Sequence, residues 1–190
     1  MRPEDLESFS RFLEELRRES HRGLALIGAA FLDEKLAEIL QAFFCKEAGD
    51  LLYGKNAPLG SFSARIETCH SLALIEDIER NDCDCIRRIR NEFAHRVIGT
   101  SFDEGKIADF CSNLKSNLPE PETPRKLPAR FLFQNAIVTM ATRLFYRAEH
   151  VAHLDKRIPK VWIDPETIRW RRTSEELPPD GTPVLGTVVR

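Results

Sequence analysis

Apolar residues recur at spacings of three and four along most of this chain, and that spacing is the feature that most constrains its fold. It places the apolar side chains on one face of an α-helix, whereas a half-buried β-strand would alternate strictly between apolar and polar residues. The first such stripe lies between residues 4 and 18 and consists of Leu6, Phe9, Leu13 and Leu16. The pattern predicts an all-α fold, a bundle of five to six helices.

The helix that begins at residue 24 and ends near residue 47 is expected to be central and the most buried. It is apolar on more than one side, and Gly28, Ala29 and Ala30 allow a neighbour to approach closely. Ser61 is a suitable N-cap for the helix that follows the loop at residues 49–60. The expected helices span residues 4–18, 24–47, 61–74, 76–97, a short stretch opened by residues 101–103, and residues 129–154.

A change of composition near residue 155 divides the chain. Prolines punctuate a polar linker at residues 119–128, but the helical pattern resumes after it. The tail contains both tryptophans, several prolines and a β-favouring run at residues 182–189. We therefore expect a helical domain at residues 1–155 and a tail at residues 156–190, which is an irregular or β appendage or part of an appended module.

Composition narrows the class of protein. The net charge of −2 argues against a surface coated for nonspecific nucleic-acid binding. Five cysteines without framework spacing, together with a polar, acidic N-terminus, predict reduced thiols and a cytoplasmic location. No apolar run is long enough for a membrane span, so no membrane association is expected.

Neither a metal nor a cofactor is expected. Cys83 and Cys85 would face different directions on a helix, and no second ligand pair lies nearby. The chain has no glycine-rich phosphate loop, dinucleotide fingerprint or nucleophile elbow. A helix-turn-helix is not expected either, because the helix after the turn at Gly60 offers only one basic residue.

Arg90, Asn91 and His95 are the candidate catalytic residues. Arginine offers a permanent cation for phosphate oxygens, histidine exchanges a proton near neutral pH, and Asn91 is placed to orient the ring of His95. On a straight helix, Arg90 and His95 diverge by about 140°. A working site would therefore need a bend, a helix end or a second copy of the chain. The alternative is a solvated helix face or a structural role.

A basic surface is a second candidate site. The densest cationic run is at residues 87–90, with Arg96 one turn beyond. Such a run can bind an acidic protein or a nucleic-acid backbone, or it can simply be a solvated face. The candidate binding residues are Arg22, Arg65, Arg87, Arg88 and Arg96.

Several blocks of sequence, taken in order, resemble the mannitol operon repressor (MltR-like) family over about residues 15–150. The blocks lie at residues 19–23, 31–34, 57–66, 86–95, 101–103 and 111–115. The resemblance implies an all-helical regulator of transcription that acts through protein contacts rather than through a standard DNA-binding motif. This chain has His21 where an aspartate is expected in the family. In the tail, Trp170 and residues 174–185 resemble the opening of a small bacterial domain of unknown function.

The Arg90, Asn91 and His95 stretch also resembles the signature of the wider HEPN superfamily. That resemblance implies a homodimer in which the arginines and histidines of two copies meet, and in active members a metal-independent endoribonuclease. Three hypotheses therefore stand. The chain is a transcriptional regulator with a protein partner, it is such a nuclease, or Arg90 and His95 hold the bundle together. The run Gly28-Ala29-Ala30 is taken as weak support for dimerisation.

Overall fold

The computed structural model describes residues 2–96, 99–103, 105–116, 127–154, 168–169 and 187–188. The chain divides into two compact units, Met1–Lys156 and Arg157–Arg190. In the second unit, the described residues form two short antiparallel strands, β1 (Ile168–Arg169) and β2 (Thr187–Val188). The first unit is helical throughout its described secondary structure, so the all-α prediction is confirmed.

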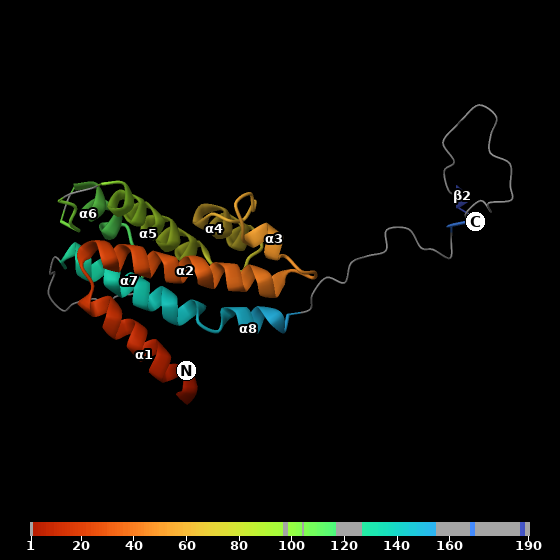
Figure 1. Ribbon diagram of the computed structural model, residues 1–190, viewed down its shortest axis with the longest axis horizontal. Coiled ribbons are helices and arrows are strands. Elements are labelled where there is room, and N and C mark those ends of the chain that lie inside the picture. Colours follow the sequence, from red (N-terminus) through yellow and green to blue (C-terminus); the bar gives the residue numbers. More distant parts are fainter. Residues whose placement is uncertain are drawn as a thin grey trace, which may run out of the picture. The chain divides into compact units, whose positions relative to one another are not determined.

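The helices of the first unit pack around α2, which runs through the middle of the bundle with α5 and α4 on one side and α7 and α8 on the other (Figure 1). Nine residues of α2 are buried, as expected for a central helix. The helices are α1 (Pro3–Arg18), α2 (His21–Phe43), α3 (Gly49–Leu52), α4 (Phe62–Ser71), α5 (Asp77–His95), α6 (Gly105–Ser112), α7 (Ala129–Leu144) and α8 (Arg147–Ala152).

Two helix starts show how local chemistry sets the boundaries. Ser61 caps α4 as predicted, since its hydroxyl accepts a hydrogen bond from the backbone N–H of Ala64. Ser20 caps α2 in the same way through Gly23, so α2 begins three residues earlier than the apolar spacing predicts. The expected loop at residues 49–60 contains the one-turn helix α3, and α4 ends at Ser71 rather than at residue 74.

Close packing of α2 against α7 uses the small residues of α2. A Cβ atom at Gly28 would lie 2.9 Å from Cδ1 of Ile137, so this glycine lets the two helices approach. Gly28 and Ala29 are buried inside the chain, and Ala30 is exposed. This run therefore gives no support for dimerisation, because two of its three residues already contact this chain's own core, and the dimer stays a prediction.

The last strong helix predicted, residues 129–154, is two helices in the structure. Tyr146 donates a hydrogen bond to Asp5 at 2.7 Å, and Arg147 donates to the carboxylate of Glu79 at 2.9 Å and to the carbonyl of Leu74. Tyr146 has non-helical backbone angles. These contacts with distant residues accompany the break between α7 and α8, and apolar spacing alone does not reveal them.

The apolar spacing of residues 76–97 predicts an inner face made of Ile78, Cys85, Ile86, Ile89 and Phe93, and the structure differs from it at one end. Ile86, Ile89 and Phe93 are buried as expected, but Ile78 is 39% exposed. Glu79 and Asp82 take buried positions instead. The carboxylate of Glu79 closes the capping box of α5 and pairs with Arg147, and that of Asp82 accepts hydrogen bonds from the residues after α6. Buried carboxylates need such partners, which explains why they can replace apolar residues here.

Thiol reactivity provides a direct check of this core. Cys45 is exposed, whereas burial raises the pKa of Cys69 and of Cys111 to about 12 and raises that of Cys83 and Cys85 as well. At pH 8 the buried thiols stay protonated, and the thiolate is the reactive form. We expect Ellman's reagent to label one thiol rapidly in the native protein and all five in denaturant. Fast labelling of several thiols in the native protein would contradict this packing.

Among the described residues, no helix is both long enough and apolar enough to cross a membrane.

Candidate functional site

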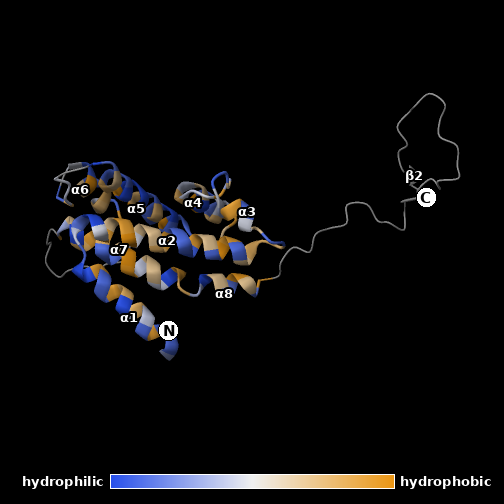
Figure 2. Cartoon of the chain, in the orientation of Figure 1, coloured by the Kyte–Doolittle hydropathy of each residue, from blue (hydrophilic) through white to orange (hydrophobic). Residues whose placement is uncertain are grey.

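The candidate catalytic residues Arg90, Asn91 and His95 lie on α5, and the outward side of this helix is hydrophilic in Figure 2. At roughly 100° per residue, six polar side chains share that side, and none of them belongs to the buried set. We call this set the outer face of α5, and it consists of Arg80, Asp84, Arg87, Arg88, Asn91 and His95.

Arg90 does not belong to the outer face. It is half-buried, and its positive charge acts on Asp33 of α2. Burial raises the pKa of the Asp33 carboxyl, and the positive charges of Arg65 and Arg90 oppose that rise. His95 is exposed. A single chain therefore separates Arg90 from His95, as the helical geometry predicts, and the meeting of these groups across two copies stays a prediction.

Arg88 is the arginine that shares the side of α5 with His95. The two residues are seven positions apart, which corresponds to about 20° of rotation and two helical turns. Asn91 lies between them on the same side. Within the described part of the chain, neither Asn91 nor His95 makes a side-chain hydrogen bond, so both remain available to a ligand or a partner.

Asp84 holds two of the predicted binding residues side by side. The Arg87 Nη2 atom lies 2.6 Å from Oδ1 of Asp84, and the Arg88 Nε atom lies 2.7 Å from Oδ2. The Arg88 guanidinium also stands over the ring of Phe110, 5.8 Å from its centroid. Arg87 and Arg88 are therefore aligned at the surface, and each leaves guanidinium nitrogens that do not contact Asp84.

Arg65 was predicted to contribute to a binding surface, and that prediction is wrong. The residue is 6% exposed. Its guanidinium donates to the carbonyls of Leu52 and Leu59 and to the Asp33 carboxylate at 2.8 Å. It also faces the ring of Tyr53. These bonds connect α4 to α2 and to the loop around α3, so Arg65 has a structural role inside the bundle.

Arg22, in the first turn of α2, contacts Arg96 at the C-cap of α5. The Arg22 guanidinium donates to the backbone carbonyl of Arg96, and Nη2 of Arg96 pairs with Glu92 at 3.2 Å. The neighbouring His21 accepts a hydrogen bond from the backbone N–H of Phe102. The start of α2 therefore binds the connection between α5 and α6, and His21, which stands where an aspartate is expected, does so through a ring nitrogen.

A polar cleft between α4 and α5 was not predicted. It has a volume of about 380 Å³. Glu67 of α4 binds the Arg80 guanidinium with nitrogen–oxygen distances of 3.0–3.2 Å. The spacing of Arg80, Asp84 and Arg88 at i, i+4 and i+8 was a visible signal, but nothing in the sequence placed Glu67 opposite them. The α4–α5 cleft is lined by Glu67, Arg80, Asn81, Asp84, Arg87 and Arg88.

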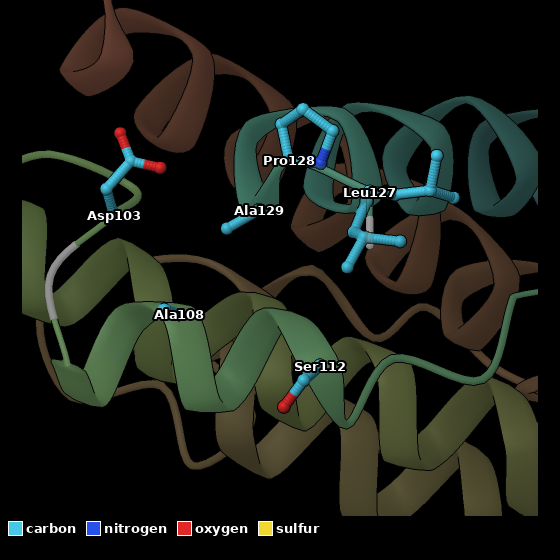
Figure 3. Close-up of a pocket in the computed structure, with 7 residues that line it drawn as sticks. Asp103, Ala108, Ser112, Leu127, Pro128 and Ala129 are labelled. Carbon is cyan, nitrogen blue, oxygen red and sulfur yellow. The ribbon is translucent and has the colours of Figure 1, made fainter. Parts of the chain in front are cut away.

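A second pocket, of about 500 Å³, lies between α6 and the start of α7 (Figure 3). Leu127, Pro128 and Ala129 line one side, and Ala108 and Ser112 line the other. It contains none of the candidate residues. No group of three His, Cys, Asp or Glu side chains in the described ranges could hold a metal ion.

The comparisons with known proteins give one informative match. No family model matches the sequence, and no curated protein matches it. A solved structure, the X-ray structure of the MtlR–HPr complex from Escherichia coli, matches with a TM-score of 0.52 and 22% identity, covering 76% of this chain and 98% of the matched chain. The predicted resemblance is thus confirmed at the level of the fold: the helical unit has an MtlR-like fold, and the matched protein was crystallised with HPr.

Proposed function

We propose that this chain is an MtlR-like regulator of transcription, a repressor, that acts through protein contacts and takes an HPr protein as its partner. One observation carries the proposal. The fold match spans almost the whole of the matched chain, and that structure is a complex of MtlR with HPr.

The structure of α4 supports protein contacts over DNA reading. A recognition helix presents several side chains to phosphates and base edges. The helix after the turn at Gly60 offers Arg65 as its one arginine, and this guanidinium is buried and fully engaged inside the bundle. α4 therefore lacks the cationic surface that a recognition helix needs.

Calorimetric titration with purified E. coli HPr tests the proposal. We expect saturable binding with a Kd on the order of micromolar, or about −8 kcal/mol. A matched titration with a small, unrelated protein that lacks acidic segments should show no saturation. If HPr also fails to saturate at concentrations of about 100-fold above that Kd, the proposed partner is wrong.

We further propose that the chain is a homodimer. Arg90 and His95 lie on different sides of α5 in one chain, and a second copy would be needed to bring such groups together. Light scattering after size-exclusion chromatography should give twice the mass of the 21.8 kDa chain. A monomer at concentrations of about 100 μM would contradict the dimer.

A second candidate function is a metal-independent endoribonuclease, favoured by the exposure of His95. Its ring has no hydrogen-bond partner within the described residues and can exchange a proton with solvent or substrate. Under this hypothesis, RNA cleavage persists in excess chelator and is lost in His95→Ala. His153→Ala, which removes an exposed histidine of the C-cap of α8, is the matched control. Equal activity in all three proteins would point to a contaminating nuclease and contradict this function.

A further inference from the structure

We propose that the α4–α5 cleft is a binding site for an acidic segment of a protein partner. This inference rests on the proposed function, because it names the surface through which a protein-binding regulator would act. The cleft contains three guanidinium groups and two carboxylates, so it carries an excess positive charge of one. That balance is suited to one or two carboxylates from a partner rather than to an apolar ligand.

The arrangement of Arg87 and Arg88 prepares them to bind oxyanions. Asp84 uses one oxygen for each guanidinium, at 2.6 and 2.7 Å, and so fixes the two planar groups beside each other. A guanidinium has five N–H donors in a fixed geometry that matches a carboxylate. Arg87 directs Nε and Nη2 at Asp84, and Arg88 directs Nε. The other nitrogens can donate to an incoming group without breaking these contacts.

Exposure makes the internal pairs of the cleft easy to rearrange. The side chains of Arg80 and Glu67 are 45% and 56% exposed, and that of Arg88 is 53% exposed. Ion pairs at such positions contribute little to stability, since water competes for both partners. A carboxylate from a partner can therefore replace Glu67 or Asp84 beside a guanidinium with little loss of stability. The partner also excludes water from the new ion pair.

The cleft continues into a longer polar surface. Arg80 and His95 are 15 residues apart on the outer face of α5, which corresponds to about 22 Å along the helix. Asn91 and His95 offer further donors on that side and have no hydrogen-bond partner among the described residues. A short acidic segment lying along α5 would contact the cleft first and these two residues next.

Fluorescence anisotropy with a labelled oligoglutamate peptide tests the site. We expect the wild-type chain to bind the peptide at about 50 mM salt and more weakly at about 300 mM. The variant Arg87→Gln/Arg88→Gln should bind about tenfold more weakly. Arg11→Gln/Arg18→Gln is the matched control, since it removes the same charge from two exposed arginines of α1 that likewise pair with carboxylates of their own helix. The control should change affinity less than twofold.

Several outcomes would overturn the assignment. Equal weakening by both double variants would show a general charge effect, and absence of peptide binding to the wild type would remove the site. Tighter binding of an oligouridylate through the same arginines would assign the cleft to nucleic acid. Far-UV circular dichroism checks that each variant is folded. Arg87→Lys/Arg88→Lys keeps the charge but not the guanidinium groups, so its affinity for the peptide should lie between those of the wild type and Arg87→Gln/Arg88→Gln. If HPr fails to bind while oligoglutamate binding depends on Arg87 and Arg88, then HPr is not the partner, but the α4–α5 cleft is still a binding site for acidic segments.

Discussion

Replacing Arg65 with methionine is expected to lower the free energy of unfolding by about 3 kcal/mol. Methionine fills much of the same space but donates no hydrogen bonds. The carbonyls of Leu52 and Leu59 and the half-buried carboxylate of Asp33 would lose the donor that satisfies them. Buried groups left without partners cost more than the interaction itself contributed. Urea unfolding followed by circular dichroism measures the change.

Arg11→Met is the control for this prediction. Arg11 pairs with Glu7 on the exposed side of α1, and its side chain is 71% exposed. We expect a change of less than about 0.5 kcal/mol there, because surface ion pairs contribute little. An Arg65→Met protein as stable as the control would show that Arg65 does not anchor α4 to α2.

Truncating Phe102 to alanine should lower the free energy of unfolding by about 4 kcal/mol. The ring is fully buried between Phe93 of α5 and Phe133 of α7, with centroid distances of 4.9 and 5.0 Å. It also contacts the ring of His21 at the start of α2. Removing it opens a cavity that three elements line, and each of them is held in place by other contacts. Thermal unfolding and urea unfolding both report the loss.

Phe131→Ala is the matched control, since that ring lies on α7 but is 47% exposed. Its loss should cost less than about 1 kcal/mol. Phe102→Leu, which keeps most of the volume, should cost about 1.5 kcal/mol. A similar change in stability for Phe102→Ala and Phe131→Ala would contradict the packing of the connection between α5 and α6.

Local rules predict much of the bundle correctly. The stripe of α1, the Ser61 cap and the apolar character of α2 come from spacing and capping chemistry within a few residues. The predictions of helix bounds and of burial are wrong where contacts with residues distant in the sequence determine the structure. Residues 129–154 read as one helix, but Tyr146 and Arg147 bind Asp5 and Glu79, and the helix breaks there. Ile78 reads as core, but the capping box and the Arg147 pair bury Glu79 instead.

The candidate site divides in the same way. The divergence of Arg90 and His95 follows from helical geometry, and in the structure Arg90 is half-buried with its charge acting on Asp33, whereas His95 is exposed. The burial of Arg65 could not be predicted, because its hydrogen-bond partners lie in α2 and in the loop around α3. The α4–α5 cleft could not be predicted either, since Glu67 meets Arg80 only when two helices pack.

The amino-acid sequence by itself determined that this chain is helical, where most helices begin, and which polar residues share a side of α5. These properties depend on interactions between residues a few positions apart, and the sequence displays that spacing directly. Tertiary structure alone decided which charges are buried and which reach the surface. A guanidinium such as that of Arg65 or Arg88 has the same chemistry in both places, and only the packing of other helices around it determines whether water or protein satisfies its donors.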